Sequence, residues 1–328
     1  HADAGSARVD RVDPIEVVTI GETMVQLVPK GERLQDAAFL HVGIGGAESN
    51  LASYLAAAGR AVSWVSAVGD DPLGRRMLED IASYGVDVSG VRVDRYAPTG
   101  IYFKDPDGSG ATAVYYYRRA SAASCLSAGS IDLPELSTVR VVHMSGITMA
   151  LSRDCAGLVR DVRTRAKAAD ALFSFDVNYR PALWPVEQAG PELLAQARAS
   201  DVVFVGLDEA NTLWGCASPG DVHELMPSTR VVVKDGAVGA TSYAPDRPDA
   251  DAFVPARPTE VVEAVGAGDA FAAGYLHALL ADAPEHVRLD VGHRFAEVAL
   301  RSIHDVATPD EVRVAVAGLD LTRPPLRR

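Results

Sequence analysis

The residues with the clearest chemical potential form the run Val265–Gly274, in which two glycines stand just before an aspartate. Beyond Gly268 the apolar residues recur at helical spacing, so the glycines stand where a loop enters a helix. Small residues there let backbone N–H groups converge on an anion, and the helix dipole adds positive potential. Gly266, Ala267 and Gly268 therefore predict an anion hole that stabilises a phosphoryl group during its transfer. Asp269, in the first turn, is predicted to take a proton from an attacking hydroxyl.

The same residues also have a purely structural interpretation, in which the glycines form a tight turn and Asp269 is the N-cap of the helix. A dinucleotide-binding fold would place such glycines in its first strand-to-helix turn, whereas these lie towards the C-terminal end. The glycine-rich segment Gly43–Ala47 lies nearer the start, but no Gly-x-Gly-x-x-Gly follows the first predicted strand. The placement of the glycines therefore argues against an NAD-dependent oxidoreductase.

The elements that must position this site alternate between two periodicities. Short β-branched runs predict strands at 17–20, 62–68, 139–144, 172–176, 202–205 and 231–234. Apolar residues spaced by three and four predict helices within 50–58, 73–84, 155–168 and 192–199. Strands that alternate with helices predict an α/β fold with a mostly parallel central sheet flanked by helices.

Two segments interrupt this alternation. Residues 23–42 carry no helical pattern, and residues 99–119 alternate like a β-hairpin with a turn at 105–108. Asp-Gly between two β-rich runs is a strong turn signal. Non-helical excursions from an α/β core often cover a binding site, so these two segments predict a small β-sheet lid.

Composition limits the classes of function. The chain has 328 residues, 48% of them hydrophobic, and a net charge of −13. Such an acidic surface repels nucleic acid and anionic membranes, so neither is expected as a partner. No apolar run reaches the length of a membrane helix, and three scattered cysteines argue for a reducing compartment, which makes the cytoplasm the expected location. The polar start, 1–14, and the Pro- and Arg-rich end, 321–328, are expected to be flexible.

Three motifs resemble those of the ribokinase-like (PfkB) carbohydrate kinases, and they occur along the chain in the order typical of that family. Val261–Gly274 is similar to the C-terminal signature of that family, Gly43–Ala52 to its N-terminal sugar-binding signature, and Val68–Gly74 to its Gly-x-Asp-x-x-Gly element. The resemblance implies a ribokinase-like fold. Its α/β core for nucleotide and sugar would comprise 15–22, 43–96 and 120–320, and its lid 23–42 and 97–119.

The resemblance also implies the cofactors ATP and Mg²⁺. The nucleotide is expected to contact Asn178, Lys234, Gly236, Gly239, Gly266 and Gly268. Glu209 matches the acidic residue that the family links to Mg²⁺ through water, but the Asn that accompanies it is Gly206 here. Metal binding is therefore expected to depend on water and the ATP phosphates. The family's usual monovalent-cation segment is replaced by Glu263-Ala264-Val265, so potassium dependence is not predicted.

Three further segments resemble 2-keto-3-deoxygluconate kinases, namely 115–124, 143–147 and 176–184. A sugar acid of that kind carries a carboxylate, which a planar guanidinium binds with two charge-assisted hydrogen bonds. The predicted guanidinium donors are Arg118, at the end of the lid hairpin, and Arg180, beyond a parallel strand. Tyr102 and Tyr116 are predicted to face each other across the hairpin and cover the sugar. By resemblance, the substrate pocket is completed by Gly46, Asn50, Ile147 and Asp305.

Alternatives to each assignment stay open at this level. The tyrosines of the hairpin are also explained by their high strand propensity alone. Asp305 would also suit the cap of a helix that begins near Pro309. The expected reaction is ATP-dependent phosphorylation of 2-keto-3-deoxygluconate to its 6-phosphate. The alternatives are a fructokinase, a 5-keto-2-deoxygluconate kinase or a non-catalytic sugar-binding protein. Lids of related kinases often pair between subunits, so a homodimer through the lid is one expected arrangement.

Overall fold

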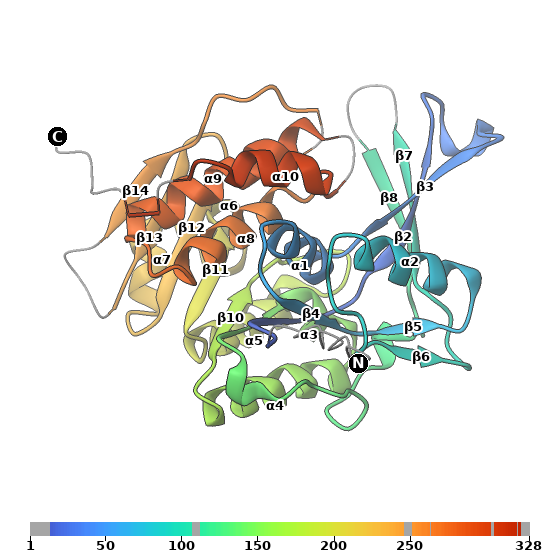
Figure 1. Cartoon of the computed structure of the whole chain (residues 1–328), viewed down its shortest axis with the longest axis horizontal. Helices are drawn as coiled ribbons and strands as arrows, with labels where there is room; N and C mark the ends of the chain where they lie inside the picture. Colours follow the sequence, from blue (N-terminus) through green and yellow to red (C-terminus); the bar gives the residue numbers. More distant parts are fainter. Residues whose placement is uncertain are drawn as a thin grey trace, which may run out of the picture.

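The computed structural model describes residues 14–106, 112–245, 251–262, 264–302, 305–319 and 321–322. Two sheets dominate the structure (Figure 1), a large one surrounded by helices and a small one that projects from one side. The termini expected to be flexible lie almost entirely outside the described residues, as do residues 107 and 108 of the predicted hairpin turn.

The large sheet has eight strands in the order β14-β13-β12-β11-β10-β9-β1-β4. The six adjacent strands β12, β11, β10, β9, β1 and β4 all run parallel to one another. Strands β13 and β14 pair antiparallel at one edge of the sheet. The strands are β1 (Val17–Ile20), β4 (Val62–Val65), β9 (Val141–Ser145), β10 (Leu172–Asp176), β11 (Val202–Gly206), β12 (Arg230–Asp235), β13 (Gly239–Tyr243) and β14 (Ala252–Pro255). The predicted α/β class with a mostly parallel sheet is therefore confirmed.

Helices cover both faces of this sheet. Successive strand residues point to opposite sides, so that Val17 belongs to one hydrophobic core and Val18 to the other. The first core packs against α1 (Ala47–Ala57), α2 (Pro72–Ala82), α8 (Ala267–Leu279), α9 (Glu285–Arg301) and α10 (Pro309–Val316). The second packs against α3 (Gly146–Leu151), α4 (Arg153–Ala168), α5 (Val186–Arg198), α6 (Leu207–Trp214) and α7 (Pro219–Leu225).

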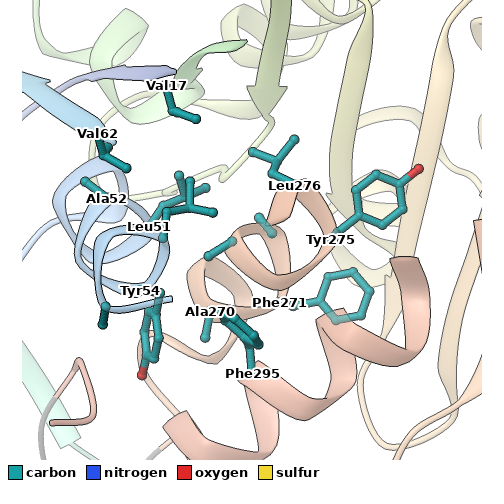
Figure 2. Packing of buried hydrophobic residues seen from close by; sticks show 14 of the residues in the cluster. Val17, Leu51, Ala52, Tyr54, Val62, Ala270, Phe271, Tyr275, Leu276 and Phe295 are labelled. Atoms are coloured by element: carbon teal, nitrogen blue, oxygen red, sulfur yellow. The ribbon is translucent and has the colours of Figure 1, made fainter. Parts of the chain in front are cut away.

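Helices α1 and α8 form the centre of the first core. Figure 2 shows Leu51 and Tyr54 of α1 beside Ala270 and Leu276 of α8, with Phe295 of α9 closing the cluster. Both helices are buried along almost their whole length, which explains why neither shows a strongly polar face in the sequence. Because their N-terminal ends meet, residues at the start of each helix are brought together.

The small sheet has four strands in the order β3-β2-β7-β8, which are β2 (Met24–Pro29), β3 (Leu40–Gly45), β7 (Ile101–Pro106) and β8 (Thr112–Tyr117). A short 3-10 helix, Leu34–Asp36, connects β2 and β3. The predicted β-sheet lid is therefore present, while the core and lid boundaries drawn from the sequence stay a prediction. Every residue of β8 is exposed, and a homodimer through this strand also stays a prediction.

One predicted strand was wrong in extent. Residues 62–68 form two strands, because after Val65 the chain leaves the large sheet and continues as β5 (Ala67–Gly69), paired in parallel with β6 (Arg92–Asp94). The buried Ser66 stands at the bend, where its hydroxyl donates to the carbonyl oxygen of Gly21 at 2.7 Å.

Within the described part of the chain, no helix combines the length and the apolar character that crossing a membrane requires.

Candidate active site

A cleft of about 1290 Å³ lies between the carboxyl ends of the parallel strands and the small sheet. Every residue that the sequence assigned to a site lines this cleft, from both the core and the lid. They are Gly46, Asn50, Tyr102, Tyr116, Arg118, Ile147, Asn178, Arg180, Glu209, Lys234, Gly236, Gly239, Gly266, Ala267, Gly268, Asp269 and Asp305. The fold thus brings together residues that are far apart in the chain.

The N-terminus of α8 forms one end of the cleft. Gly266 is its N-cap and has a φ of +83°, a left-handed conformation that favours glycine. A Cβ atom at this position would lie 2.3 Å from the carbonyl oxygen of Asp305, so a side chain is excluded on steric grounds as well. The N–H groups in the first turn of a helix have no partner inside the helix, which leaves this end suited to an anion.

Asp269 lies in the first turn of α8 and is held by a residue from the other signature segment. The Asn50 side-chain amide donates a hydrogen bond of 2.9 Å to Oδ2 of Asp269. Burial raises the pKa of Asp269 to about 7, Asp176 adds to this, and Asn50, Lys234 and Arg180 oppose it. The interpretation of Asp269 as the N-cap is wrong, because Gly266 is the cap and the Asp269 carboxylate accepts from another helix.

Lys234, near the end of β12, reaches the same end of the cleft. Its ammonium group pairs with Oδ2 of the buried Asp176 at 2.9 Å, and a Cβ at Gly268 would lie 3.4 Å from Lys234 Nζ. Burial lowers the pKa of Lys234, but Asp176 and Glu209 outweigh this and raise it, so Lys234 stays a cation. Asp176 is a functional candidate that the sequence analysis did not assign, although it opens the segment 176–184.

Asn178 and the turn after β12 line the part of the cleft where the sequence predicts nucleotide contacts. Asn178 has a φ of +40° and its N–H donates to Oδ1 of Asp176 at 3.2 Å. Residues 236–238 form the turn that connects β12 to the antiparallel β13. Gly236 has a φ of +45°, and Gly239 packs so closely that a Cβ would lie 2.4 Å from the carbonyl oxygen of Val254.

Glu209 uses both carboxylate oxygens locally. Oε1 accepts from the Tyr179 N–H at 2.9 Å and Oε2 from the Gly206 N–H at 2.8 Å. Burial raises its pKa, and the nearby Asp176 adds to the shift. Among the described residues no group of three or more His, Cys, Asp or Glu could hold a metal ion. Asp176 and Glu209 line the cleft as separate carboxylates, an arrangement compatible with Mg²⁺ that is bound mainly through water and phosphate.

The lid supplies the opposite end of the cleft. Tyr102 of β7 and Tyr116 of β8 are direct cross-strand partners with ring centroids 5.9 Å apart, as predicted. The Tyr102 hydroxyl accepts from Gln26 at 2.7 Å and donates to Asp305 at 3.3 Å. Lys104 of β7 pairs with the same carboxylate at 3.6 Å.

Asp305 therefore belongs to the cleft and joins it to two lid strands. The interpretation of Asp305 as the cap of α10 is wrong, because the Thr308 side chain caps that helix. Lys104, which lines the cleft, and Gln26, which donates to Tyr102 and Asp305 behind it, are further residues that the sequence did not indicate. Their only signal is a polar side chain inside a strand of the lid.

The two arginines predicted to bind a carboxylate differ in their surroundings. Arg118 lies 11% exposed in an ion pair with Glu22, whose side chain is 0% exposed. Arg180 is exposed and, among the described residues, its side chain makes no ion pair or hydrogen bond, while its charge lowers the pKa of Asp269. Arg118 is thus paired with a buried carboxylate, whereas the Arg180 side chain is in no ion pair among the described residues, although its charge also lowers the pKa of Glu209.

A buried glutamate joins the segments that carry Gly46 and Ile147, two residues predicted to contact the substrate. Glu48 of α1 accepts hydrogen bonds at Oε1 from the Ser145 N–H at 2.9 Å, the Ser145 hydroxyl at 2.7 Å and the Thr148 hydroxyl at 3.1 Å. Burial raises its pKa to about 7. These bonds hold the turn that carries Ile147 against the helix that begins after Gly46.

Comparison with known proteins identifies the family of the chain. The family model for pfkB family carbohydrate kinases matches residues 14–310. The 2-dehydro-3-deoxygluconokinase of Thermoproteus tenax is 35% identical over 281 residues, covering 81% of this chain and 82% of that protein. Fructokinase-1 of Oryza sativa subsp. japonica is 32% identical over 273 residues, covering 81% and 83%.

A solved structure shows the same fold. The fructokinase of Xylella fastidiosa with bound ATP superposes with a TM-score of 0.80 at 24% identity, covering 92% of this chain and 98% of that one. The match of the family model over nearly the whole chain, together with these relatives, establishes the class of enzyme. The chain belongs to the PfkB family of carbohydrate kinases, which are ATP-dependent phosphotransferases.

Proposed function

We propose that this kinase phosphorylates the terminal hydroxyl of a 2-keto-3-deoxy sugar acid, with 2-keto-3-deoxygluconate (also called 2-dehydro-3-deoxygluconate) as acceptor and its 6-phosphate as product. The observation that carries the proposal is a single cleft with a carboxylate in the first turn of a helix and an exposed arginine that is in no ion pair among the described residues. Asp269 is the carboxylate, and Arg180 is the arginine. Relatives that share 30% identity or more include gluconokinases of this type as well as fructokinases.

Asp269 acts as the general base in this proposal. Asn50 orients its carboxylate through Oδ2 and leaves Oδ1 for the acceptor hydroxyl. A base with a pKa of about 7 is matched to proton transfer near neutral pH. As the hydroxyl proton passes to Asp269, the hydroxyl oxygen becomes a better nucleophile toward the phosphoryl group.

The N-terminal amides of α8 and the Lys234 ammonium stabilise the charge that develops during transfer. Gly266, Ala267 and Gly268 allow the group to approach the backbone, and Lys234 Nζ lies on the same side. These donors are held by the fold before any ligand binds, so little reorganisation is needed. ATP supplies the phosphoryl group when bound, and Asn178, Gly236 and Gly239 would line its site.

Mg²⁺ would be held mainly through water and phosphate. The carboxylates of Asp176 and Glu209 line the cleft, but Lys234 and two backbone N–H groups already occupy them. Glu209 would therefore act through a water molecule, as the family resemblance implies. The metal neutralises phosphate charge when bound.

At the acceptor end, Arg180 supplies the charge that favours an acid. Arg118, Tyr102 and Tyr116 would contact the rest of the sugar, beside Gly46, Asn50, Ile147 and Asp305. A second acceptor class, neutral ketoses such as fructose, is favoured by one observation. Glu22 offsets the charge of Arg118, so the lid side of the pocket is close to neutral.

The test is ADP release by the purified protein with ATP, Mg²⁺ and a panel of acceptors. The panel comprises 2-keto-3-deoxygluconate, 5-keto-2-deoxygluconate, fructose and ribose. Turnover with the highest kcat/KM for 2-keto-3-deoxygluconate is expected. Robust turnover of fructose with none of the sugar acids would refute the acceptor, and no turnover of any sugar would favour a non-catalytic binding protein.

A further inference from the structure

The cleft contains a buried carboxylate that the proposed reaction does not use. Glu22 follows β1, and its side chain is fully buried although the residue lines the cleft. Its Oε1 accepts a hydrogen bond of 2.8 Å from the Ser121 hydroxyl, and its Oε2 pairs with Nη2 of Arg118. Burial raises the pKa of Glu22, and the charge of Arg118 opposes this shift. A buried charge destabilises the folded state unless it is paired, so Glu22 depends on Arg118 as its partner.

Glu22 lies directly under the acceptor end of the cleft. A Cβ at Gly46 would lie 2.5 Å from the backbone carbonyl oxygen of Glu22, so the two segments are in contact. Gly46 caps α1, whose Asn50 holds the base Asp269. Contacts therefore run without a break from the reacting group to Glu22.

Arg118 connects this carboxylate to the lid. It directly follows β8, and its guanidinium carbon lies 5.5 Å from the centroid of the Tyr116 ring. Its Nε is buried without a hydrogen-bond partner. The guanidinium thus pairs with Glu22 through Nη2 and keeps a buried N–H donor that is not used, while Arg118 as a residue lines the cleft.

The charges at this point limit which acceptor group can lie beside Arg118. A sugar carboxylate placed there would share one guanidinium with Glu22, and two carboxylates at one cation repel each other. A hydroxyl or a carbonyl oxygen would accept from Arg118 without that repulsion. Arg180 is in no ion pair among the described residues, although its charge lowers the pKa of Asp269 and Glu209, so its guanidinium donors are open to a carboxylate of the acceptor.

We propose that Glu22 sets the acceptor selectivity of this kinase: it holds the Arg118 guanidinium at the acceptor end and offsets its charge, so that acid recognition falls to Arg180. The acceptor named here rests on the proposed function, whereas the placement of Arg118 by Glu22 does not. Glu22 acts through Arg118 and is therefore a positioning residue. It would restrain, by repulsion, the binding of acceptors with a second acidic group.

The first experiment tests the placement and needs no substrate. Phenylglyoxal modifies accessible arginines, and the rates at Arg118 and Arg180 would be followed by peptide mass spectrometry. In the native protein Arg118 should react much more slowly than Arg180. In Glu22→Ala the Arg118 rate should rise several-fold, while the Arg180 rate serves as the internal reference. An unchanged Arg118 rate in folded Glu22→Ala would overturn the proposal.

The second experiment tests selectivity with Glu22→Gln, which keeps an acceptor for Ser121 but removes the charge. The ratio of kcat/KM for 2-keto-3-deoxygluconate over fructose should rise on the order of tenfold, mainly through a lower KM for the acid. The rise should disappear when Arg118→Gln is added. A matched control is Glu16→Gln, which also removes a carboxylate paired with arginines, at 3.1 Å from Arg60, but outside the cleft. That control should leave the ratio unchanged.

The two experiments separate the possible failures. An unchanged selectivity ratio in Glu22→Gln, or an equal rise with and without Arg118, contradicts the role of Glu22 in selectivity. If the native enzyme turns over no sugar acid, the proposed acceptor is wrong. The phenylglyoxal rates then still test whether Glu22 holds the Arg118 guanidinium in place. Thermal unfolding of each variant shows whether it is folded, and Glu22→Gln is used if Glu22→Ala is not.

Discussion

The two ends of the cleft are built in different ways. At the phosphoryl end, consecutive residues from Gly266 to Asp269 form the helix start, and one partner, Asn50, comes from elsewhere. At the acceptor end, Glu22, Arg118 and Arg180 come from separate segments, and each has its own electrostatic surroundings. The first end depends on backbone geometry, the second on how charged side chains are paired.

This difference separates the reaction from the substrate. A helix N-terminus that receives a phosphoryl group works in the same way for any sugar, because it contacts only the group that is transferred. The charge pattern around the arginines depends on the acceptor, because a buried pair and an open arginine favour different chemical groups. Relatives that are equally similar to this chain can therefore carry different substrate names.

The largest expected effect lies at the phosphoryl end. Asp269→Asn should lower kcat by roughly 10²–10⁴ for every acceptor, because it removes the general base. The fold should persist, since Gly266 and not Asp269 caps the helix. Steady-state kinetics would be compared with calorimetric binding of a non-hydrolysable ATP analogue.

A stability measurement adds a control to this variant. The pKa of Asp269 in the folded protein is about 7, above the ordinary value of 3.8 for an aspartate. The folded state therefore loses stability as the pH rises from the unfolded pKa to the folded pKa. Asn cannot ionise, so Asp269→Asn should unfold at no lower temperature than the native protein at pH 8. Near-native kcat with unchanged affinities would show that Asp269 is not the base.

The next effect concerns the backbone of the anion hole. Gly266→Ala should lower kcat by about 10²-fold, because a Cβ 2.3 Å from the Asp305 carbonyl oxygen would displace the first turn of α8. Gly59→Ala is the matched control, with a φ of +89° and nothing within 4 Å of an added Cβ. It should cost only the conformational strain, about 1 kcal/mol of unfolding free energy, and leave kcat unchanged. Equal effects of both changes on kcat would remove the geometric argument for Gly266.

Arg180→Ala tests the acceptor end. It should lower kcat/KM for the sugar acid more than tenfold and leave that for fructose nearly unchanged, because a charge-assisted bidentate contact is lost. Arg180→Lys should recover only part of the loss. The readout is the ratio of the two kcat/KM values.

Arg118→Ala is the comparison variant for Arg180→Ala. It should change the selectivity ratio less but lower the unfolding temperature more, because it leaves Glu22 buried without its partner. The reverse order, in which Arg118→Ala abolishes acid selectivity and Arg180→Ala does not, would contradict the proposed division between the two arginines.

The smallest expected effect is a pH dependence. Since Asp269 must be deprotonated to act as a base and has a pKa of about 7, kcat/KM should rise about tenfold between pH 6 and pH 8. The residual activity of Asp269→Asn should lack this rise. A flat profile in the native enzyme would mean that another step limits the rate or that Asp269 stays ionised throughout.

Much of the molecule could be predicted from local patterns. The strand and helix periodicities predicted the α/β class, because the strands of a parallel sheet that is buried on both faces appear in the sequence as short runs of apolar residues. The segment Gly266–Asp269 indicated the anion hole, because the backbone conformation that it needs is itself local. The split of 62–68 into two strands was missed, since the bend at Ser66 depends on its contact with Gly21.

The pairing of buried charges was decided only by the tertiary structure. Asn50 and Asp269 are 219 positions apart in the chain, and no spacing rule joins them. The sequence treated Arg118 and Arg180 alike, although one is paired with a buried carboxylate and the other is open. The physical reason is that the energy of a charge depends on its distance to other charges and to water, and folding alone sets both.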